Sequence, residues 1–149
     1  MLYPLKFEPI YKSTVWGGRN IGKRFGRILP EGKIAESWEI SCRDEGISVV
    51  ANGPLKGKTL QYLMETFKDE LLGSKVYRSS PTWFPLLIKI IDANDKLSVQ
   101  VHPDDTYAKA NNEENGKTEM WYVIDAKPGA NLIYGLANGA GKQEFLDAI

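Results

Sequence analysis

The chain has 149 residues, enough for one domain of common size or for part of a larger one. Its 19 Lys and Arg residues balance 19 Asp and Glu residues, and this zero net charge argues against nucleic acid as a partner, because neutralising phosphate backbones requires a basic surface. The sequence has no apolar run of bilayer length and no signal-peptide pattern, and the single Cys42 excludes an intrachain disulfide, so we expect a cytoplasmic protein without a membrane partner.

The first half of the chain predicts short strands separated by turns, followed by one helix. Residues 36–41 alternate polar and apolar side chains, and residues 47–51 are rich in β-branched side chains, as strands favour. Residues 59–72 predict a helix that packs on a core, because apolar side chains recur there at helical spacing. The stripe consists of Leu60, Leu63, Met64, Phe67 and Leu71. Thr59 can cap the start of this helix, and Gly73 can end it in a left-handed turn.

The second half of the chain turns to β patterns. Further strands are predicted at residues 86–91, 96–101, 119–124 and 130–134. Pro103 starts a short helical turn that runs to about Ala110, and a polar loop follows over 111–116. Residues 143–149 predict an amphipathic helix whose apolar stripe still runs at the last residue, so we expect a longer protein. Many short strands with helices outside them predict a mainly β fold with peripheral helices, either an antiparallel barrel or a sandwich.

Ser98, Gln100 and His102 alternate with valines in one of these strands. Residues two apart in a strand share a face, so the three polar side chains project together while Val99 and Val101 point the other way. His102 is the only histidine, and a lone histidine is more often structural than a ligand, so its neighbours carry the interpretation. A polar interior face indicates a cavity, and its buried polar groups need partners that a metal ion or a bound sugar can supply.

Glu119 begins the next predicted strand, and Lys117 lies on the same face by the two-residue rule. Antiparallel pairing of 97–102 with 119–124 would bring Glu119 beside Gln100 and His102. Their O, N and O donors suit a catalytic Zn²⁺ ion that keeps an open position. An ordinary hydrogen bond between Glu119 and His102 across two strands is the alternative, and the spacing alone leaves both open.

Lys89 stands inside an otherwise apolar strand, where an unpaired ammonium group is costly to bury. One interpretation is an edge strand from which Lys89 reaches solvent along its aliphatic stem. The other is that its ammonium group points into the polar cavity and pairs with a carboxylate or a phosphate. The residues alone favour neither.

Several segments in this order resemble a known family, the type I phosphomannose isomerases, which are zinc-dependent mannose-6-phosphate isomerases of the cupin fold. The segments are Trp16-Gly17-Gly18 and residues 35–39, 49–54, 87–93, 97–104 and 117–122. Glu119 follows His102 by only 17 positions, a spacing that resembles the short bacterial form of the family.

The resemblance implies a metal site for one Zn²⁺ ion per active site, with Gln100, His102 and Glu119 as ligands. The family's fourth ligand, a second histidine, and a substrate-site arginine come later, and this sequence has no histidine after His102 and no arginine after Arg78. We therefore expect residues 1–149 to be the N-terminal part of a single cupin-type catalytic domain, truncated at its C-terminus. Its antiparallel β-barrel, or jelly roll, would be incomplete, and unpaired edges would favour self-association.

The resemblance also implies a reaction, the interconversion of mannose 6-phosphate and fructose 6-phosphate through an enediol. It places Lys89 and Lys117 in the active site as catalytic residues, without deciding which of them transfers protons or binds phosphate. Ser98 matches a position implicated in phosphate contact. Trp16 and Glu36 would line the sugar pocket, although Trp16 also suits a core aromatic residue.

Two functions from different classes fit these observations. The first is the zinc-dependent isomerase acting on a sugar phosphate, of which this 149-residue chain would be an inactive part. The second is a non-catalytic cupin module that binds a metal ion or a sugar phosphate. The missing histidine and arginine favour the second for this chain, whereas a polar cavity that combines Lys89, Lys117 and a metal-binding face favours the first for the whole protein.

Overall fold

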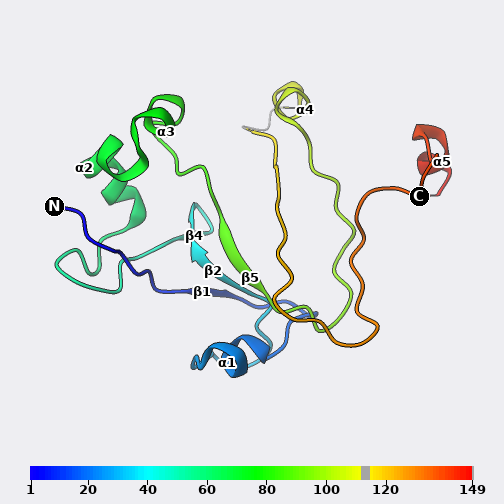
Figure 1. The fold of residues 1–149 in the computed structure, drawn as a ribbon, viewed down its shortest axis with the longest axis horizontal. Helices are drawn as coiled ribbons and strands as arrows, with labels where there is room; N and C mark the ends of the chain where they lie inside the picture. Colours follow the sequence, from blue (N-terminus) through cyan, green and yellow to red (C-terminus); the bar gives the residue numbers. More distant parts are fainter. Residues whose placement is uncertain (112–114, 149) are drawn as a thin grey trace. The chain divides into compact units, whose positions relative to one another are not determined.

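The computed structural model describes residues 1–111 and 115–148, which form two units, Met1–Leu97 and Ser98–Ile149 (Figure 1). In the first unit, β1 (Ile10–Lys12), β2 (Glu36–Ile40) and β5 (Ile88–Ile91) form an antiparallel sheet in the order β1-β2-β5. The expected strand over 36–41 is therefore confirmed as the central strand, and the strand over 86–91 is confirmed in its last four residues.

A short hairpin follows the sheet, formed by β3 (Cys42–Arg43) and β4 (Gly46–Ile47). The strand predicted over 47–51 is only partly confirmed. Beyond Ile47 the chain forms isolated bridges, from Val49 to Thr59 and from Val50 to Phe7. The β-branched side chains there indicate burial correctly, since Val50 is fully buried, but no second strand lies alongside to continue the ladder.

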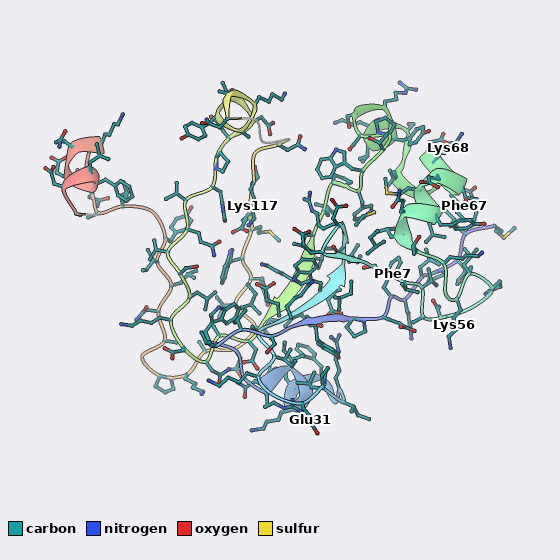
Figure 2. All side chains as sticks on the ribbon, turned by 180° about the vertical axis from the view of Figure 1, so that it is seen from behind. Phe7, Glu31, Lys56, Phe67, Lys68 and Lys117 are labelled. Carbon is teal, nitrogen blue, oxygen red and sulfur yellow. The ribbon has the colours of Figure 1, made fainter. Side chains whose placement is uncertain are left out.

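Helix α2 (Leu60–Leu72) confirms the clearest prediction. The Thr59 hydroxyl accepts a hydrogen bond from the Tyr62 N–H at 3.1 Å, which caps the first turn. The apolar stripe is buried at Leu60 and Leu63 against Val50, and Phe7 and Phe67 pack on the same cluster (Figure 2).

The end of α2 differs from the expectation in one respect. Gly73 has the positive φ of 76° expected of a terminating glycine, but its ψ of 148° lies outside the left-handed helical region. The chain passes directly into α3 (Ser74–Ser79). Within α2, Lys68 has φ 48° and ψ −119°, a kink that the regular apolar spacing did not indicate.

Helix α1 (Asn20–Phe25) packs through Ile21 on a second small core cluster beside the sheet. The Asp92 carboxylate, which follows β5 and is 6% exposed, accepts hydrogen bonds from the Asn20 backbone N–H at 2.6 Å and from the Asn20 side chain at 2.9 Å. A buried carboxylate is thus satisfied by the first residue of the helix, and the helix is fixed to the end of β5.

The two faces of β2 carry two polar groups, one built around Glu36 and the other around Glu39. On the second face, Arg27 holds Glu39 through two hydrogen bonds, of 2.7 and 2.9 Å, and the Ser37 hydroxyl donates to the same carboxylate at 2.6 Å. Partial burial raises the pKa of Glu39, but the hydrogen bonds from Arg27 and Ser37 outweigh this and lower it below 4.5.

We expect the substitution Glu39→Gln to lower the free energy of unfolding at pH 7 by about 1–3 kcal/mol, because a charged hydrogen-bond pair is lost. A carboxyl group with a lowered folded-state pKa stabilises the fold above its unfolded pKa, and this stabilisation disappears as the pH falls through the folded value. The difference between wild type and variant should therefore be largest above pH 4.5 and shrink below it. Urea unfolding at a series of pH values measures it, and a difference that stays constant from pH 7 to pH 3 would contradict the assignment.

The second unit contains α4 (Asp105–Ala110) and α5 (Lys142–Asp147). The helical turn predicted after Pro103 is confirmed as α4, whose first turn is capped by the Asp104 carboxylate accepting from the Tyr107 N–H at 2.7 Å. The amphipathic helix predicted over 143–149 is confirmed as α5, except that residue 149 lies outside the described residues. Residues 112–114 of the predicted polar loop also lie outside them.

The strands predicted at 96–101, 119–124 and 130–134 are wrong for this structure, since no strand is assigned in the described part of the second unit. Their apolar positions are open to solvent: Val101 is 79% exposed and Met120 is 91% exposed. Alternation along the sequence indicates a side chain's preferred face, but a strand forms only where a neighbouring strand accepts its backbone hydrogen bonds.

Antiparallel sheets accompanied by helices, as the sequence predicts, are confirmed in the first unit. In residues 1–111 and 115–148, no helix has the length and apolar character needed to cross a membrane.

Candidate active site

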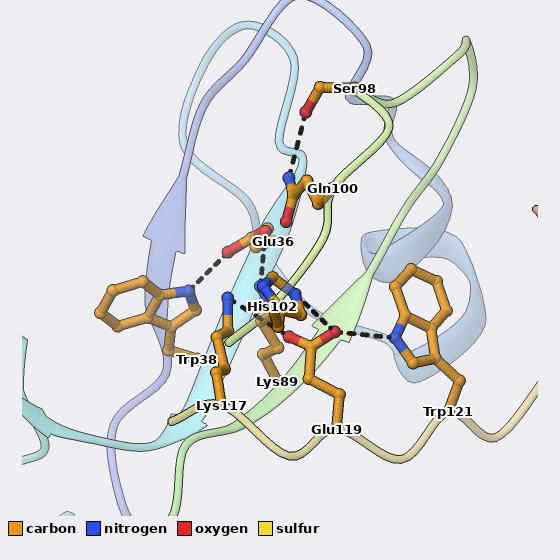
Figure 3. Close-up of polar contacts among 9 residues, drawn as sticks. All are labelled: Glu36, Trp38, Lys89, Ser98, Gln100, His102, Lys117, Glu119 and Trp121. Carbon is orange, nitrogen blue, oxygen red and sulfur yellow. Dashed lines mark hydrogen bonds and ion pairs between the residues drawn. The ribbon is translucent and has the colours of Figure 1, made fainter. Parts of the chain in front are cut away.

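The second unit brings His102 and Glu119 into contact. His102 Nε2 lies 3.1 Å from Glu119 Oε2, and the two side chains are 23% and 29% exposed (Figure 3). On the other carboxylate oxygen, Lys117 Nζ lies 3.3 Å from Glu119 Oε1. The Trp121 indole N–H donates to Glu119 Oε2 at 3.4 Å. Glu119 is therefore the centre of this polar group.

The backbone explains why residues 17 apart in sequence meet. The chain extends to α4, turns back and runs alongside its own outgoing segment, where the Lys117 N–H donates to the Pro103 carbonyl at 3.0 Å (Figure 1). The Gly116 N–H donates to the Asp105 carboxylate at 2.9 Å. A Cβ atom on Gly116 would lie 2.5 Å from the Asp104 carbonyl carbon, so the return segment approaches α4 this closely only with glycine at this position.

The charge state of Glu119 follows from its neighbours. Partial burial raises its pKa, but the hydrogen bonds from Trp121 and Lys117, together with the positive charge of Lys117, outweigh this and lower the pKa below 4.5. Glu119 is therefore an anion at neutral pH, the state in which a carboxylate binds a cation.

Gln100 and Ser98 lie on one side of their segment, as the two-residue rule predicts, because the Gln100 side-chain amide donates to the Ser98 hydroxyl at 3.0 Å. Val99 and Val101, which alternate with them, are 70% and 79% exposed. The convergence of Gln100 with His102 and Glu119 on one ion stays a prediction.

An open cavity of about 460 Å³ adjoins His102 in the same unit. It is lined by Val101, His102, Pro103, Asp104 and Tyr107. This volume lies in the range of small-molecule sites, which span about 300–1,000 Å³. The imidazole thus borders an open depression in the surface of this unit.

The first unit holds a second polar group, around Glu36. Lys89 Nζ lies 3.0 Å from Glu36 Oε1, and the Trp38 indole N–H donates to Glu36 Oε2 at 2.7 Å (Figure 3). The side chains of Lys89 and Glu36 are 25% and 16% exposed. Trp38 is the cross-strand neighbour of Lys89, which places these groups on one face of the β2–β5 pair. Lys89 thus combines both interpretations: it stands on the edge strand β5 of the described sheet, and its ammonium group pairs with a carboxylate. Whether Lys89 and Lys117 face one cavity stays a prediction.

Trp16 is partly buried, and its carbonyl accepts the Asn94 N–H at 2.9 Å. The next residue, Gly17, is buried, and a Cβ atom there would lie 2.6 Å from the Ala35 backbone nitrogen. The Trp-Gly-Gly motif therefore lets this loop lie directly against the residue before β2. The role of Trp16 in a sugar pocket stays a prediction.

Sequence reasoning missed Trp38 and Trp121, each of which donates an indole N–H to a carboxylate of its own unit, Glu36 and Glu119 respectively. The available signal was a recurring Glu-x-Trp pattern, at 36–38 and 119–121, whose spacing places both side chains on one face of an extended segment.

Within the described part of the chain, no group of three or more His, Cys, Asp and Glu side chains is arranged to hold a metal ion. A metal site here therefore needs a ligand of another type, such as Gln100, or one from outside these residues.

Residues 4–129 match the family model described as the phosphomannose isomerase type I catalytic domain. The chain therefore belongs to the type I phosphomannose isomerase family, as the motif resemblance predicts.

Similar proteins and a solved structure support the same family assignment. The chain is 46% identical over 155 residues to a probable mannose-6-phosphate isomerase, GmuF, of Bacillus subtilis, covering all of this chain and 46% of that protein. It is 47% identical over 135 residues to mannose-6-phosphate isomerase of Streptococcus mutans, covering 91% of this chain and 41% of that protein. The crystal structure of mannose 6-phosphate isomerase from Bacillus subtilis superposes with a TM-score of 0.74 at 43% identity, covering 83% of this chain and 38% of that one. The chain thus spans less than half the length of these relatives.

Proposed function

We propose that these residues belong to a cytoplasmic, zinc-dependent mannose-6-phosphate isomerase that converts its substrate to fructose 6-phosphate through an enediol. The observation that carries the proposal is the pairing of His102 with Glu119, with Lys117 on the second carboxylate oxygen, in a chain of this family. Relatives that bear the isomerase name, at 46% and 47% identity, support the choice of substrate.

The donor atoms fit a zinc ion. Two ligands of a tetrahedral ion with bonds of ~2.0–2.1 Å stand about 3.3–3.4 Å apart. His102 Nε2 and Glu119 Oε2 are 3.1 Å apart, so a small outward shift would admit the ion between them. Imidazole nitrogen and carboxylate oxygen are both ordinary zinc ligands, and the Gln100 amide oxygen would supply a third. A bound zinc ion would polarise the sugar oxygens and stabilise the negative charge of the enediolate.

The chain's own residues supply the remaining chemistry of the proposal. Isomerisation moves a proton between C1 and C2 of the sugar and another between the two oxygens. The Lys89 ammonium group, held by Glu36 Oε1, can donate a proton to a sugar oxygen and become a neutral amine, which can take the proton back later in the isomerisation; the neighbouring carboxylate stabilises the charged lysine before the donation and after the proton returns. Lys117, held by Glu119, and Ser98 would contact the substrate, with Ser98 on the phosphate. Trp16 and Glu36 would line the sugar pocket.

We place these residues in a cupin-type antiparallel barrel. The three-stranded sheet of the first unit would be one part of it, and the extended segments 96–101, 119–124 and 130–134 would become strands once partner strands lie beside them. Without such partners, their free backbone groups and exposed apolar side chains favour self-association of the chain.

A non-catalytic cupin module that binds metal or sugar phosphate is the alternative. It is favoured by the single histidine among the 149 residues, because these residues can supply only one imidazole ligand to a metal ion. The metal content of the purified product of the complete reading frame separates the two, when measured together with conversion of mannose 6-phosphate in a coupled assay. An isomerase holds about one zinc per site, loses turnover on chelation and regains it with Zn²⁺. A protein that binds zinc stoichiometrically without turnover would establish the alternative.

A further inference from the structure

The Glu36 carboxylate of the first unit and the Glu119 carboxylate of the second unit share one arrangement of donors. Glu36 receives Lys89 on Oε1 at 3.0 Å and the Trp38 indole on Oε2 at 2.7 Å. Glu119 likewise receives a lysine on Oε1, at 3.3 Å, and an indole on Oε2, at 3.4 Å (Figure 3). In each case the tryptophan stands two residues after the glutamate. The contacts of Glu36 are shorter than those of Glu119, so the inference is drawn for Glu36 and Trp38.

The chemistry of the indole suits it to hold a carboxylate without taking part in proton transfer. Its N–H is a donor only and does not titrate in the physiological range, so it neither accepts a proton from substrate nor competes with lysine for one. The terminal torsion of a glutamate is broad, and a carboxylate bonded at a single oxygen can rotate. A bond of 2.7 Å to Oε2 removes that freedom and leaves Oε1 directed at Lys89.

The Trp38 ring is itself held in place. It stands on the central strand β2, opposite Lys89 on β5. Lys12 Nζ, from β1, lies 4.3 Å from the centroid of the ring, and the same ammonium group donates to the Glu45 carbonyl at 2.6 Å. Cation and ring attract each other in this geometry, so Lys12 on β1 helps to hold the indole in place.

We propose that Trp38 is a positioning residue of the isomerase, whose indole N–H orients the Glu36 carboxylate and thereby holds the Lys89 ammonium group where the sugar reacts; this rests on the proposed function of Lys89. The contribution of Trp38 is made entirely through Glu36. Substitutions that remove the N–H and keep the aromatic ring therefore reduce turnover while leaving metal and substrate binding intact.

The test uses Trp38→Phe in the product of the complete reading frame. We expect kcat to fall by ~10–100-fold, the range typical of residues that orient functional side chains, with KM within about twofold and zinc content unchanged. Trp83→Phe is the matched control. Trp83 is a tryptophan of the same unit with the Arg43 guanidinium 5.1 Å from its ring centroid, and its variant should keep wild-type turnover.

A double-mutant cycle separates positioning from packing. In a Glu36→Ala background, Trp38→Phe should change kcat by less than about twofold, because the carboxylate through which the indole acts is gone. An equal loss in both backgrounds would assign Trp38 a packing role, and wild-type turnover in Trp38→Phe alone would also overturn the proposal. Since the cycle compares ratios, a folding defect common to both Phe variants cancels. Absence of turnover in the wild type would instead refute the proposed function itself, and this inference with it.

Discussion

We expect residues 1–149 alone to show no detectable isomerase activity, and we expect the product of the complete reading frame that contains them to convert mannose 6-phosphate. The 149 residues hold one histidine and no arginine beyond Arg78, and they span 46% of GmuF. A zinc site that lacks one imidazole ligand would bind the ion weakly. Without an arginine later in the chain, the negative charge of the sugar phosphate would lack a counter-ion. Each preorganised electrostatic interaction of this kind is commonly worth ~10²–10³ in rate.

The measurement is coupled conversion of mannose 6-phosphate with added Zn²⁺, using both polypeptides at equal concentration. Circular dichroism of the short chain serves as the control for folding, since α2 and the β1-β2-β5 sheet lie entirely within it. Turnover by the short chain within about tenfold of the longer one would show that Gln100, His102 and Glu119 suffice or that a second copy supplies the missing ligand.

Replacing Glu119 with glutamine should abolish most of the activity of the complete protein. The substitution keeps the size of the side chain but removes the negative charge that faces both His102 Nε2, at 3.1 Å, and Lys117 Nζ, at 3.3 Å. An amide oxygen is a weaker ligand than a carboxylate, and the Lys117 ammonium group loses its counter-ion. We expect kcat/KM to fall by ~10²–10³ and zinc occupancy to fall with it.

Glu31→Gln is the matched control, because Glu31 is an exposed residue of the loop that precedes β2 (Figure 2). It removes the same charge from the same chain and should leave both zinc content and kcat/KM unchanged. Full zinc occupancy in Glu119→Gln, with kcat/KM within tenfold of wild type, would remove Glu119 from the metal site and leave its contact with His102 an ordinary hydrogen bond.

Local signals in the sequence predicted local structure. The apolar stripe and Thr59 placed α2 within one residue of its observed start, and Pro103 placed the start of α4 within two residues. Both depend on interactions within a few residues of chain. The strands of the second unit failed because a strand needs a partner that a local pattern cannot supply.

For the candidate site too, the sequence predicted the contacts that depend on local patterns. Strand parity placed Ser98 with Gln100, and the return of the chain after α4 placed Glu119 beside His102 even without a ladder. The roles of Trp38 and Trp121 were not predictable from composition, because a tryptophan in a strand is read first as core. The Glu-x-Trp spacing could have placed each indole on the same face as a carboxylate, but the hydrogen bond between them depends on the orientation of the indole N–H, which the structure shows.

The close approach of Gly116 to α4 has a consequence for how this protein tolerates variation. A methyl group at residue 116 meets main-chain atoms of Asp104 and Asp105, at 2.5 and 2.6 Å, and not the movable end of a side chain. Substitutions of neighbouring side chains therefore cannot make room for this methyl group. A larger residue at position 116 would require the backbone of the loop to take a different path. In a saturation library scored by growth on mannose, position 116 should accept glycine alone, while the solvent-facing position 109 in α4 accepts most residues.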